Sequence, residues 1–331
     1  MNSLLEKIVN DILSNKVIPE SVDYSNFIHY LTCPRYWFFK NMLGLQRVYQ
    51  SPPIDLVFGS AWHAALEGIY TTLQYTDVVD DQTLYDIATF EFDKKWWEKD
   101  GESIDLEEAY PKTPTEADAA LWLYIKQTLP YITTHGDVIH VEMPFSIPIA
   151  AGMSIVYGTI DLVLDDGKTT TVVEHKTTKS ASLRWRESWY NSYQLEVYNA
   201  AAVTYFSPLD RETKVLISGA VFQKKTPAEK FVQIPFHKSN AAYSRFLHEL
   251  TWRLLQFEKE HEKLLEDIES DLPQAAFPRN PSVCFQYRPC NYYDLCASWT
   301  KPYACDSPPS SNWQFTEEGI YTQGGNEDAK S

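Results

Sequence analysis

The chain has 331 residues, 44% of them hydrophobic and 14% aromatic, so it can bury a sizeable core and is not globally disordered. It has 12 glycines, no Gly-x4-Gly-Lys-Ser/Thr sequence and no run of 18 apolar residues, so we expect neither a P-loop nor a membrane-spanning segment. The formal net charge of −16 means that any polyanion would have to bind a local cluster of Lys and Arg.

The first part of the chain is predicted to be helical. Residues 1–16 alternate apolar and charged side chains at helical spacing, unlike a signal peptide, so a cytoplasmic location is the expectation. A second helix is predicted over Tyr24–Leu43 and contains a Cys-Pro-Arg sequence that begins at Cys33. A third covers Ala61–Leu73 and carries His63. A lone helical histidine is more often a packing residue than a metal ligand, so His63 by itself does not identify a site.

The stretch from 77 to 135 is also mostly helical in pattern. Helical periodicity covers Gln82–Lys99 and Thr115–Ile132, and acidic side chains concentrate between Glu91 and Glu108. We expect this stretch to form a helical lobe beside the strands that follow it.

A β-hairpin is predicted near the middle of the chain. Apolar strands at 155–164 and 170–177 flank the turn-forming sequence Asp165-Asp166-Gly167-Lys168. A turn centred on Gly167 and Lys168 places Asp161 opposite Glu174. An ordinary exposed hairpin with polar residues on its wet face is the alternative.

The second strand of this hairpin carries the sequence Glu174-His175-Lys176. Residues two apart on a strand share a face, so Glu174 and Lys176 point the same way, and the side chain of His175 points to the other face. Two carboxylates and a lysine on one patch suit metal-assisted hydrolysis, because hard divalent cations prefer oxygen ligands. We expect the metal ligands to include Asp161 and Glu174.

A basic segment and a helix follow the hairpin. The basic segment offers cations for a polyanion, although solvated surface is the alternative: Lys179, Arg184 and Arg186. The helix predicted over Trp189–Tyr205 places Gln194 and Tyr198 four residues apart on one face. In so aromatic a chain, Tyr198 can equally be a core residue.

The remaining elements complete a mixed sheet. Further strands are predicted over Val138–Ile147, Lys214–Gln223 and Lys230–Pro235, and a long helix over Asn240–Ile268. Together these elements predict an α/β fold with a mixed central sheet flanked by helices. The tail at 307–331 is rich in Ser, Pro, Gly, Asn and acidic residues and is expected to be disordered.

The five cysteines are the second chemical signal. Cys33 is alone near the N-terminus, and the other four lie within 22 residues: Cys284, Cys290, Cys296 and Cys305. A cytosolic chain is not expected to hold structural disulfides, so metal binding is the better interpretation. Thiolates favour iron–sulfur clusters and zinc, but zinc sites more often use shorter spacings. Unpaired buried cysteines are the alternative.

The order of these motifs resembles the PD-(D/E)XK nuclease superfamily. Asp161 followed by Glu174-x-Lys176 is similar to its core motif, Gly59-x3-His63 to its histidine motif, and Gln194-x3-Tyr198 to the motif of the RecB-like branch. The Cys-Pro-Arg sequence and the C-terminal cysteines resemble RecB-like and AddB-like nucleases that carry an iron–sulfur cluster, including CRISPR adaptation nucleases and phage exonucleases.

This resemblance implies a set of roles. It implies that His63 and the backbone carbonyl of His175 are metal ligands, that Gln194 supports the active site and that Tyr198 lies near DNA. The implied ligands of a [4Fe-4S] cluster that joins the two ends of the domain are Cys33, Cys284, Cys290 and Cys296. The five-residue gap after Cys284 leaves Cys305 as a possible substitute.

The resemblance also implies a function and a domain organisation. A single nuclease domain over 1–306 would use Mg²⁺ or Mn²⁺ to hydrolyse DNA, more often exonucleolytically, on single-stranded or ended substrates. The setting would be prokaryotic or phage recombination, repair or CRISPR adaptation. The alternatives are a catalytically idle DNA-binding subunit of a nuclease complex and a zinc-stapled interaction protein.

Overall fold

The computed structural model describes most of the chain. The described residues are 21–48, 53–76, 78–149, 154–206, 212–225, 227, 229–237, 240–285, 289–304 and 309–316. The chain divides into two compact units. The terminal unit comprises 1–48, 148–157 and 245–331, and the sheet unit comprises 49–147 and 158–244. Whether the two units act as the single domain expected from the sequence stays a prediction.

A mixed sheet of six strands is the centre of the fold. Its path is β1-β4-β5-β6-β7, and β3 also pairs with β4. The strands are β1 (Ser21–Asp23), β3 (Asp137–Ile149), β4 (Ser154–Asp165), β5 (Thr169–Thr178), β6 (Glu212–Val221) and β7 (Phe231–Phe236). The pairs β4–β5 and β6–β7 are antiparallel, whereas β5–β6 is parallel. The expected α/β fold with a mixed sheet is confirmed.

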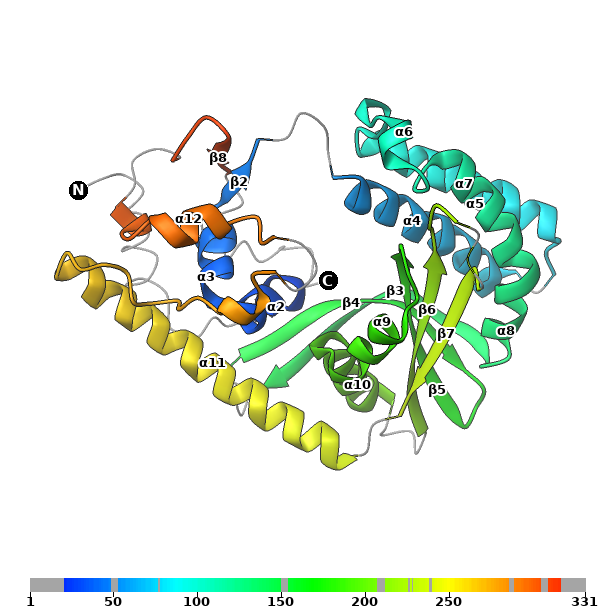
Figure 1. Ribbon diagram of the computed structural model, residues 1–331. Coiled ribbons are helices and arrows are strands. Elements are labelled where there is room, and N and C mark those ends of the chain that lie inside the picture. Colours follow the sequence, from blue (N-terminus) through cyan, green and yellow to red (C-terminus); the bar gives the residue numbers. More distant parts are fainter. Residues whose placement is uncertain are drawn as a thin grey trace. The chain divides into compact units, whose positions relative to one another are not determined.

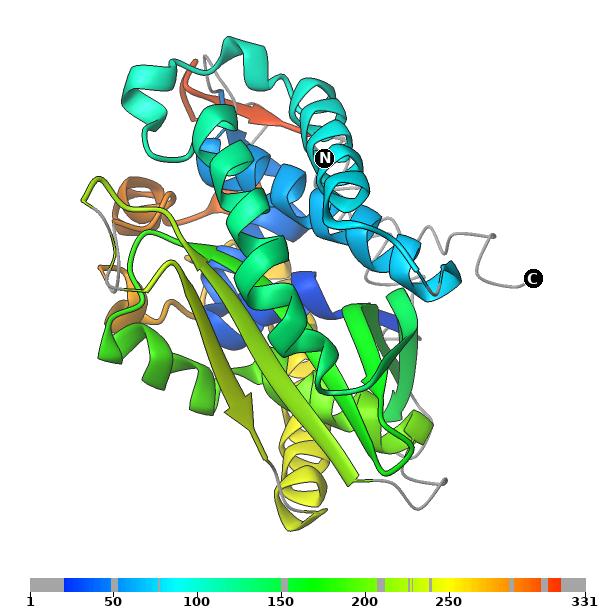
Figure 2. The same cartoon turned by 90° about the vertical axis from the view of Figure 1, so that its right-hand side faces the viewer.

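Helices cover both faces of the sheet in the sheet unit (Figures 1 and 2). One face packs against α4 (Ile54–Tyr75), α5 (Asp81–Glu98) and the helical run from α7 (Pro114–Leu123) to α8 (Leu129–Thr133), while α6 (Leu106–Ala109) is a single turn. On the other side lie α9 (Leu183–Ser188) and α10 (Tyr193–Phe206).

The core of the sheet unit is large and aromatic. Phe58 and Trp62 of α4 contact Phe222 edge-on, with ring centroids 4.7 and 5.4 Å apart. All three side chains are almost completely buried. Burial of this apolar area is the main stabilising term, at about 25 cal/mol per Å². It fixes α4, and with it His63, against the sheet.

The terminal unit has its own aromatic core. Its elements are α2 (Tyr24–Thr32), α3 (Pro34–Trp37), β2 (Leu45–Arg47), most of α11 (Asn240–Glu269), α12 (Tyr293–Ser298) and β8 (Trp313–Phe315). Tyr30 and Trp37 both meet Phe257 of α11 edge-on, at centroid distances of 4.8 and 4.7 Å. No helix in the described part of the chain is both long and apolar enough to cross a membrane.

A buried arginine joins the two ends of the chain within the terminal unit. Arg35 is 8% exposed, and its guanidinium donates to the carbonyls of Gln274, Ala276 and Phe277 at 2.8 to 3.1 Å. These acceptors lie about 240 residues away in sequence, with separations of 239 to 242. The fan of donors on a guanidinium suits this task, because one side chain satisfies three backbone carbonyls.

Three sequence expectations need correction. The helix expected over Tyr24–Leu43 is broken at Cys33, which is extended (φ −157°, ψ 107°), because the ring of Pro34 disfavours helical backbone in the residue before it. The helix expected over Trp189–Tyr205 is interrupted at Ser192, where a 3₁₀ turn ends. Within the tail expected to be disordered, Trp313–Phe315 forms β8, which pairs with β2.

The tertiary contacts of Trp313 account for the last correction. Its ring stacks on Tyr292 at 5.3 Å, and the guanidinium of Arg47 lies 4.9 Å from it. Composition does not report such contacts. The helix expected within residues 1–16, Cys305 and the end of the tail after 316 lie outside the described residues.

Candidate active site

The hairpin of β4 and β5 has the register expected from its turn. Leu162 pairs with Val173 and Asp165 with Thr170, so the next pair in the ladder is Asp161 opposite Glu174. Gly167 has φ of +85°, which glycine adopts without steric cost. A short local turn therefore sets which two carboxylates face each other.

Asp161 lies at the centre of a cluster of three potential metal ligands. One ligand atom each from His63, Glu142 and Asp161 lies within 4.8 Å of the others. His63 Nδ1 is 3.5 Å from Asp161 Oδ2, and the backbone N–H of His175 donates to the same oxygen at 2.8 Å. Helix α4 supplies the histidine, and strands β3 and β4 supply the two carboxylates.

Glu142 is a residue that the sequence reasoning missed. It lies within β3, and its φ of 47° is unusual for a residue other than glycine. Strained backbone of this kind concentrates at functional sites, where the surrounding structure holds it. The available signal was an acidic residue between the apolar Val141 and Met143, which alone does not distinguish a ligand from a solvent-facing position such as that of Asp137 in the same strand.

Glu174 is buried beside the cluster, and its two oxygens have different surroundings. Oε1 accepts hydrogen bonds from Lys176 Nζ and from Gln194 Nε2, the latter at 2.7 Å. Oε2 is buried and has no hydrogen-bond partner among the described residues. A buried carboxylate oxygen left unpaired is costly, so this oxygen is suited to a cation.

Gln194 is itself held by Tyr198. Gln194 Nε2 lies 3.0 Å from the Tyr198 hydroxyl, which donates to the carbonyl of Thr159 at 3.1 Å. Tyr198 is 5% exposed, and its ring meets Phe145 edge-on. Tyr198 is therefore a packed residue that also joins α10 to β4.

The electrostatics of the site follow from burial and crowding of like charges. Burial and the nearby Asp161 raise the pKa of Glu174 to about 7. Burial, Asp161 and Glu67 raise the pKa of Glu142 to about 7 as well. Burial opposes ionisation of Asp161, but the neighbouring His63, His175 and Lys176 hold its pKa below the usual range. Burial likewise disfavours protonated His63, but Asp161 outweighs it and raises the His63 pKa to about 9.

The side chain of His175 is buried away from Glu174 and Lys176. Its ring stacks on Tyr70 at a centroid distance of 5.5 Å, and burial lowers its pKa to about 4. This agrees with a structural side chain on the opposite face of β5. The expected metal contact through its backbone carbonyl stays a prediction.

The basic residues after β5 have protein partners. Arg186 forms an ion pair with Glu229, and Lys179 Nζ lies 3.6 Å from Asp55. Arg184 also has an interaction within the protein. The expected role of these three cations in binding DNA stays a prediction, and an incoming phosphate would compete with the carboxylates for two of them.

Four of the five cysteines are described, and all four belong to the terminal unit. The backbone N–H of Asn280 donates to Cys33 Sγ at 3.4 Å, and Cys284 Sγ donates to the carbonyl of the same residue at 3.8 Å. Burial raises the pKa of the Cys290 thiol, and the nearby Cys33 and Cys284 raise it further. For Cys296, burial has the same effect and Arg35 opposes it.

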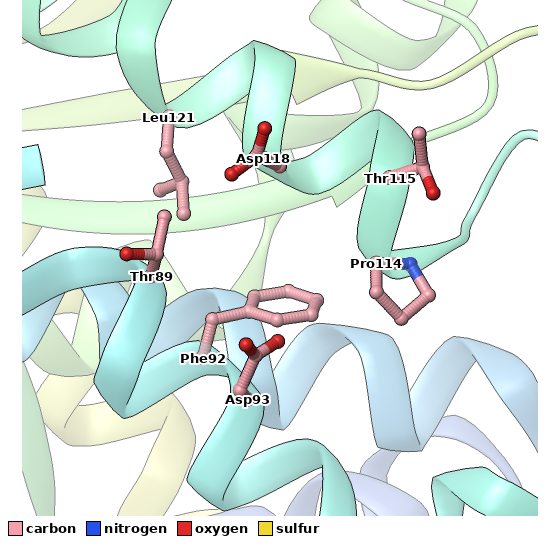
Figure 3. A pocket seen from close by; sticks show the side chains of 7 residues that line it. All are labelled: Thr89, Phe92, Asp93, Pro114, Thr115, Asp118 and Leu121. Atoms are coloured by element: carbon pink, nitrogen blue, oxygen red, sulfur yellow. The ribbon is translucent and has the colours of Figure 1, made fainter. Parts of the chain in front are cut away.

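A separate pocket of about 260 Å³ lies between α5 and α7 (Figure 3). It is lined by Thr89, Phe92, Asp93, Pro114, Thr115, Asp118 and Leu121. None of these belongs to the carboxylate cluster. Burial and the nearby Asp118 raise the pKa of Asp93. The pocket therefore contributes nothing to the candidate active site.

The residues present fit a hard divalent cation. Carboxylate oxygens from β3 and β4 and a ring nitrogen from α4 converge within 4.8 Å. Glu174 Oε2 has no partner among the described residues, and burial together with the nearby Asp161 raises the pKa of both Glu174 and Glu142, so a cation bound here would favour their ionised forms. Oxygen-rich sites with one imidazole suit Mg²⁺ or Mn²⁺ better than a soft ion.

The chain is similar to a known protein family and to solved structures. A family model described as the PD-(D/E)XK nuclease superfamily matches residues 22–297. No curated protein matches the chain. A solved structure from Eubacterium rectale, described as a candidate exonuclease, is 13% identical with a TM-score of 0.45, and the match covers 89% of this chain and 97% of that one. The structure of SSO0001 is 15% identical with a TM-score of 0.28, over 76% and 84% of the two chains.

The two structural similarities are too distant to support an argument. The family match, in contrast, spans most of the chain and contains every residue of the carboxylate cluster together with Glu174, Lys176 and Gln194. On this evidence the chain belongs to the PD-(D/E)XK nuclease superfamily.

Proposed function

We propose that this protein is a divalent-metal-dependent deoxyribonuclease that degrades single-stranded or ended DNA, more readily as an exonuclease than as an endonuclease. The observation that carries the proposal is the convergence of His63, Glu142 and Asp161 beside the buried Glu174, whose Oε2 has no partner in the described residues. Membership of a nuclease superfamily supports hydrolysis of a phosphodiester bond.

The residues of the site divide the work of hydrolysis. A bound Mg²⁺ or Mn²⁺ supplies a Lewis acid that acidifies water and neutralises phosphate charge. His63, Glu142, Asp161 and Glu174 would hold that ion, with the carbonyl of His175. Lys176 keeps a positive charge next to Glu174, where it orients the attacking water and stabilises charge that develops on the phosphate. Gln194 fixes the orientation of Glu174.

The complete set of charged residues weighs against a catalytically idle subunit. An idle relative would be expected to lack at least one of Asp161, Glu174 and Lys176, because nothing would retain a buried, unpaired carboxylate oxygen. Prokaryotic or phage recombination, repair and CRISPR adaptation remain the settings that the motif order supports.

We also propose that the cysteines of the terminal unit hold a [4Fe-4S] cluster. Cys33 and Cys284 both contact the Asn280 backbone, and in addition to burial both raise the pKa of Cys290 and of Cys296. Five residues separate Cys284 from Cys290, and five separate Cys290 from Cys296. These gaps are longer than the roughly two to four residues of most zinc sites, which supports a cluster over the zinc-stapled alternative.

An assay on end-labelled DNA tests the nuclease proposal. Single- and double-stranded substrates labelled at either end are incubated with Mg²⁺ or Mn²⁺, beside a covalently closed circle. We expect metal-dependent shortening of linear substrates, resistance of the circle and loss of cleavage in EDTA. Asp161→Asn should abolish cleavage, whereas Asp137→Asn, an exposed carboxylate at the start of β3, should not. Cleavage that survives Asp161→Asn would overturn the proposal, as would no hydrolysis of any substrate.

A further inference from the structure

A buried lysine in the sheet unit meets a second lysine at one carboxylate. Lys112 is only 3% exposed. Its Nζ donates to Asp55 Oδ1 at 2.9 Å and to Thr177 Oγ1 at 3.3 Å. Lys179 Nζ lies 3.6 Å from the same Asp55 oxygen. Two ammonium groups therefore share one carboxylate, and the group as a whole carries an excess positive charge.

The members of this group differ in freedom to move. Lys112 is enclosed, and its ring neighbour Phe58, 5.8 Å from Nζ, is fully buried. Asp55 is 45% exposed at its side chain and Lys179 is 60% exposed. Asp55 can therefore rotate towards water while Lys112 stays in place. Burial works against ionised Asp55, but the two lysines lower its pKa.

Two regular elements give the distance from this group to the active site. Asp55 precedes His63 by eight residues on α4, which is roughly 12 Å at 1.5 Å per residue. Lys179 follows Lys176 by three residues at the end of β5, which is roughly 10 Å at about 3.3 Å per residue. A DNA strand advances about 3.4 Å per nucleotide in a duplex. The group thus lies no more than about three nucleotides from the scissile bond, because a single strand can extend further per nucleotide than a strand of a duplex.

We propose that Lys112, Lys179 and the Thr177 hydroxyl form a binding subsite for a DNA backbone phosphate within about three nucleotides of the scissile bond. In the free protein, Asp55 occupies this subsite. The inference rests on the proposed deoxyribonuclease function. A phosphate presents the same charge and oxygen acceptors as the carboxylate that it displaces. Substrates too short to reach the subsite leave Asp55 in place, so the subsite also sets a minimum substrate length.

Binding measurements in EDTA test the subsite while leaving the DNA intact. The probes are fluorescent single-stranded oligonucleotides of lengths below and above about four nucleotides. We expect Asp55→Asn to tighten binding of the longer probes by roughly 3- to 10-fold. The slope of log binding constant against log salt concentration should become steeper by up to about 0.7, the value for one added phosphate contact to a single strand. The short probes should bind Asp55→Asn and wild type alike.

A matched pair elsewhere on the same unit controls for general charge effects. The Asp81 side chain is 47% exposed, close to that of Asp55, and pairs with Lys126, which is exposed as Lys179 is. Asp81→Asn should leave affinity and salt slope close to wild type. Equal tightening by Asp81→Asn and Asp55→Asn would overturn the subsite, because the effect would then be long-range electrostatics. No change in Asp55→Asn would also overturn it.

Loss of cation should act in the opposite direction. Lys179→Gln, an exposed substitution, should weaken binding of the longer probes and flatten the salt slope, and Lys126→Gln should not. Lys112→Met should also weaken binding and flatten the salt slope, provided that its melting curve shows an intact fold. If Lys112→Met does not fold, Lys179→Gln alone decides the test. The nuclease assay tests the proposed activity separately from the subsite. Metal-dependent cleavage, with no change in DNA binding by Asp55→Asn, would refute the subsite alone. Tighter DNA binding by Asp55→Asn, without cleavage of any substrate, would refute the proposed activity alone.

Discussion

Gln194 donates a hydrogen bond to Glu174 across 2.7 Å, from helix α10 to strand β5. Together with Lys176, it occupies Oε1 of the carboxylate, so Oε2 is the oxygen that remains for a ligand. The Tyr198 hydroxyl holds the same amide group at 3.0 Å. The orientation of the buried Glu174 carboxylate thus depends on helix α10. Strand β5 ends at Thr178 and α10 begins 15 residues later, at Tyr193.

The first prediction concerns this orienting contact. Gln194→Leu should reduce cleavage or metal affinity by about 10- to 100-fold, because groups that orient metal ligands have effects of this size. The metal concentration for half-maximal activity should rise while DNA affinity in EDTA stays unchanged. Gln233→Leu is the matched control, since Gln233 is half-buried but donates to Ser218 in the neighbouring strand. Equal activity in both variants would show that Gln194 is only a packing residue.

The second prediction concerns Glu142. Glu142→Gln should raise the Mg²⁺ concentration needed for activity by at least about 10-fold, because it removes a charged oxygen ligand. Titration of metal binding by calorimetry provides a readout without cleavage. Glu67→Gln should have a smaller effect, because Glu67 influences Glu142 but is not among the three converging ligands. The ligand assignment is wrong if Glu67→Gln is the more damaging change.

The third prediction concerns the buried guanidinium of the terminal unit. Arg35→Met should lower the free energy of unfolding by roughly 3–5 kcal/mol, because it leaves three backbone carbonyls without their charged donor. Arg253→Met should cost about 1 kcal/mol or less, since Arg253 makes a long, partly exposed ion pair with Glu249 at 3.9 Å. Thermal melting of the two variants provides the comparison, and similar melting temperatures would contradict it.

The fourth prediction concerns pH. Burial lowers the pKa of His261 from 6.5 to about 4, against the favourable backbone contact with Phe257. Between these values the unfolded chain binds the proton and the folded chain does not, so the stability contribution of His261 falls as pH drops from about 6.5 to about 4. The loss is on the order of 2–3 kcal/mol across the whole window.

Comparison of wild type with His261→Phe isolates this residue, because other titrating groups are common to both. Phenylalanine preserves the ring contacts with Trp37, Phe257 and Phe277. The melting temperature of His261→Phe should decline less than that of wild type between pH 7 and pH 5. Parallel declines would show that His261 is protonated in the folded protein.

The fifth prediction concerns the cysteines. Cys33→Ser or Cys290→Ser should remove absorbance near about 400 nm, which thiolate-to-iron charge transfer produces, and should lower the melting temperature. A cluster that joins Cys33 to Cys284, separated by 251 positions in sequence, cross-links a long loop and restricts the unfolded chain. Cys305→Ser should change neither property. A colourless protein with stoichiometric zinc would contradict the cluster.

The sequence by itself determined the parts of this protein that depend on local spacing. The turn at Gly167 and Lys168 sets the register of its own hairpin, so the pairing of Asp161 with Glu174 was predictable from nearby residues. The two-residue period of a strand placed Glu174 and Lys176 on one face. The helical period placed Gln194 one turn before Tyr198 on the same face of its helix. The type of each long element followed from the same periodicities.

Only the tertiary structure decided which of these local features meet. Glu142 joins His63 and Asp161 because β3 pairs with β4 and α4 packs against the sheet. The left-handed backbone of Glu142 has no signature in the sequence. Lys112 reaches Thr177 across 65 residues, and Trp313 gives order to a tail of polar composition by stacking on Tyr292. Periodicity reports the face that a side chain occupies within its own element. The partner across that face is set by the packing of the whole core, which depends on contacts distant in sequence.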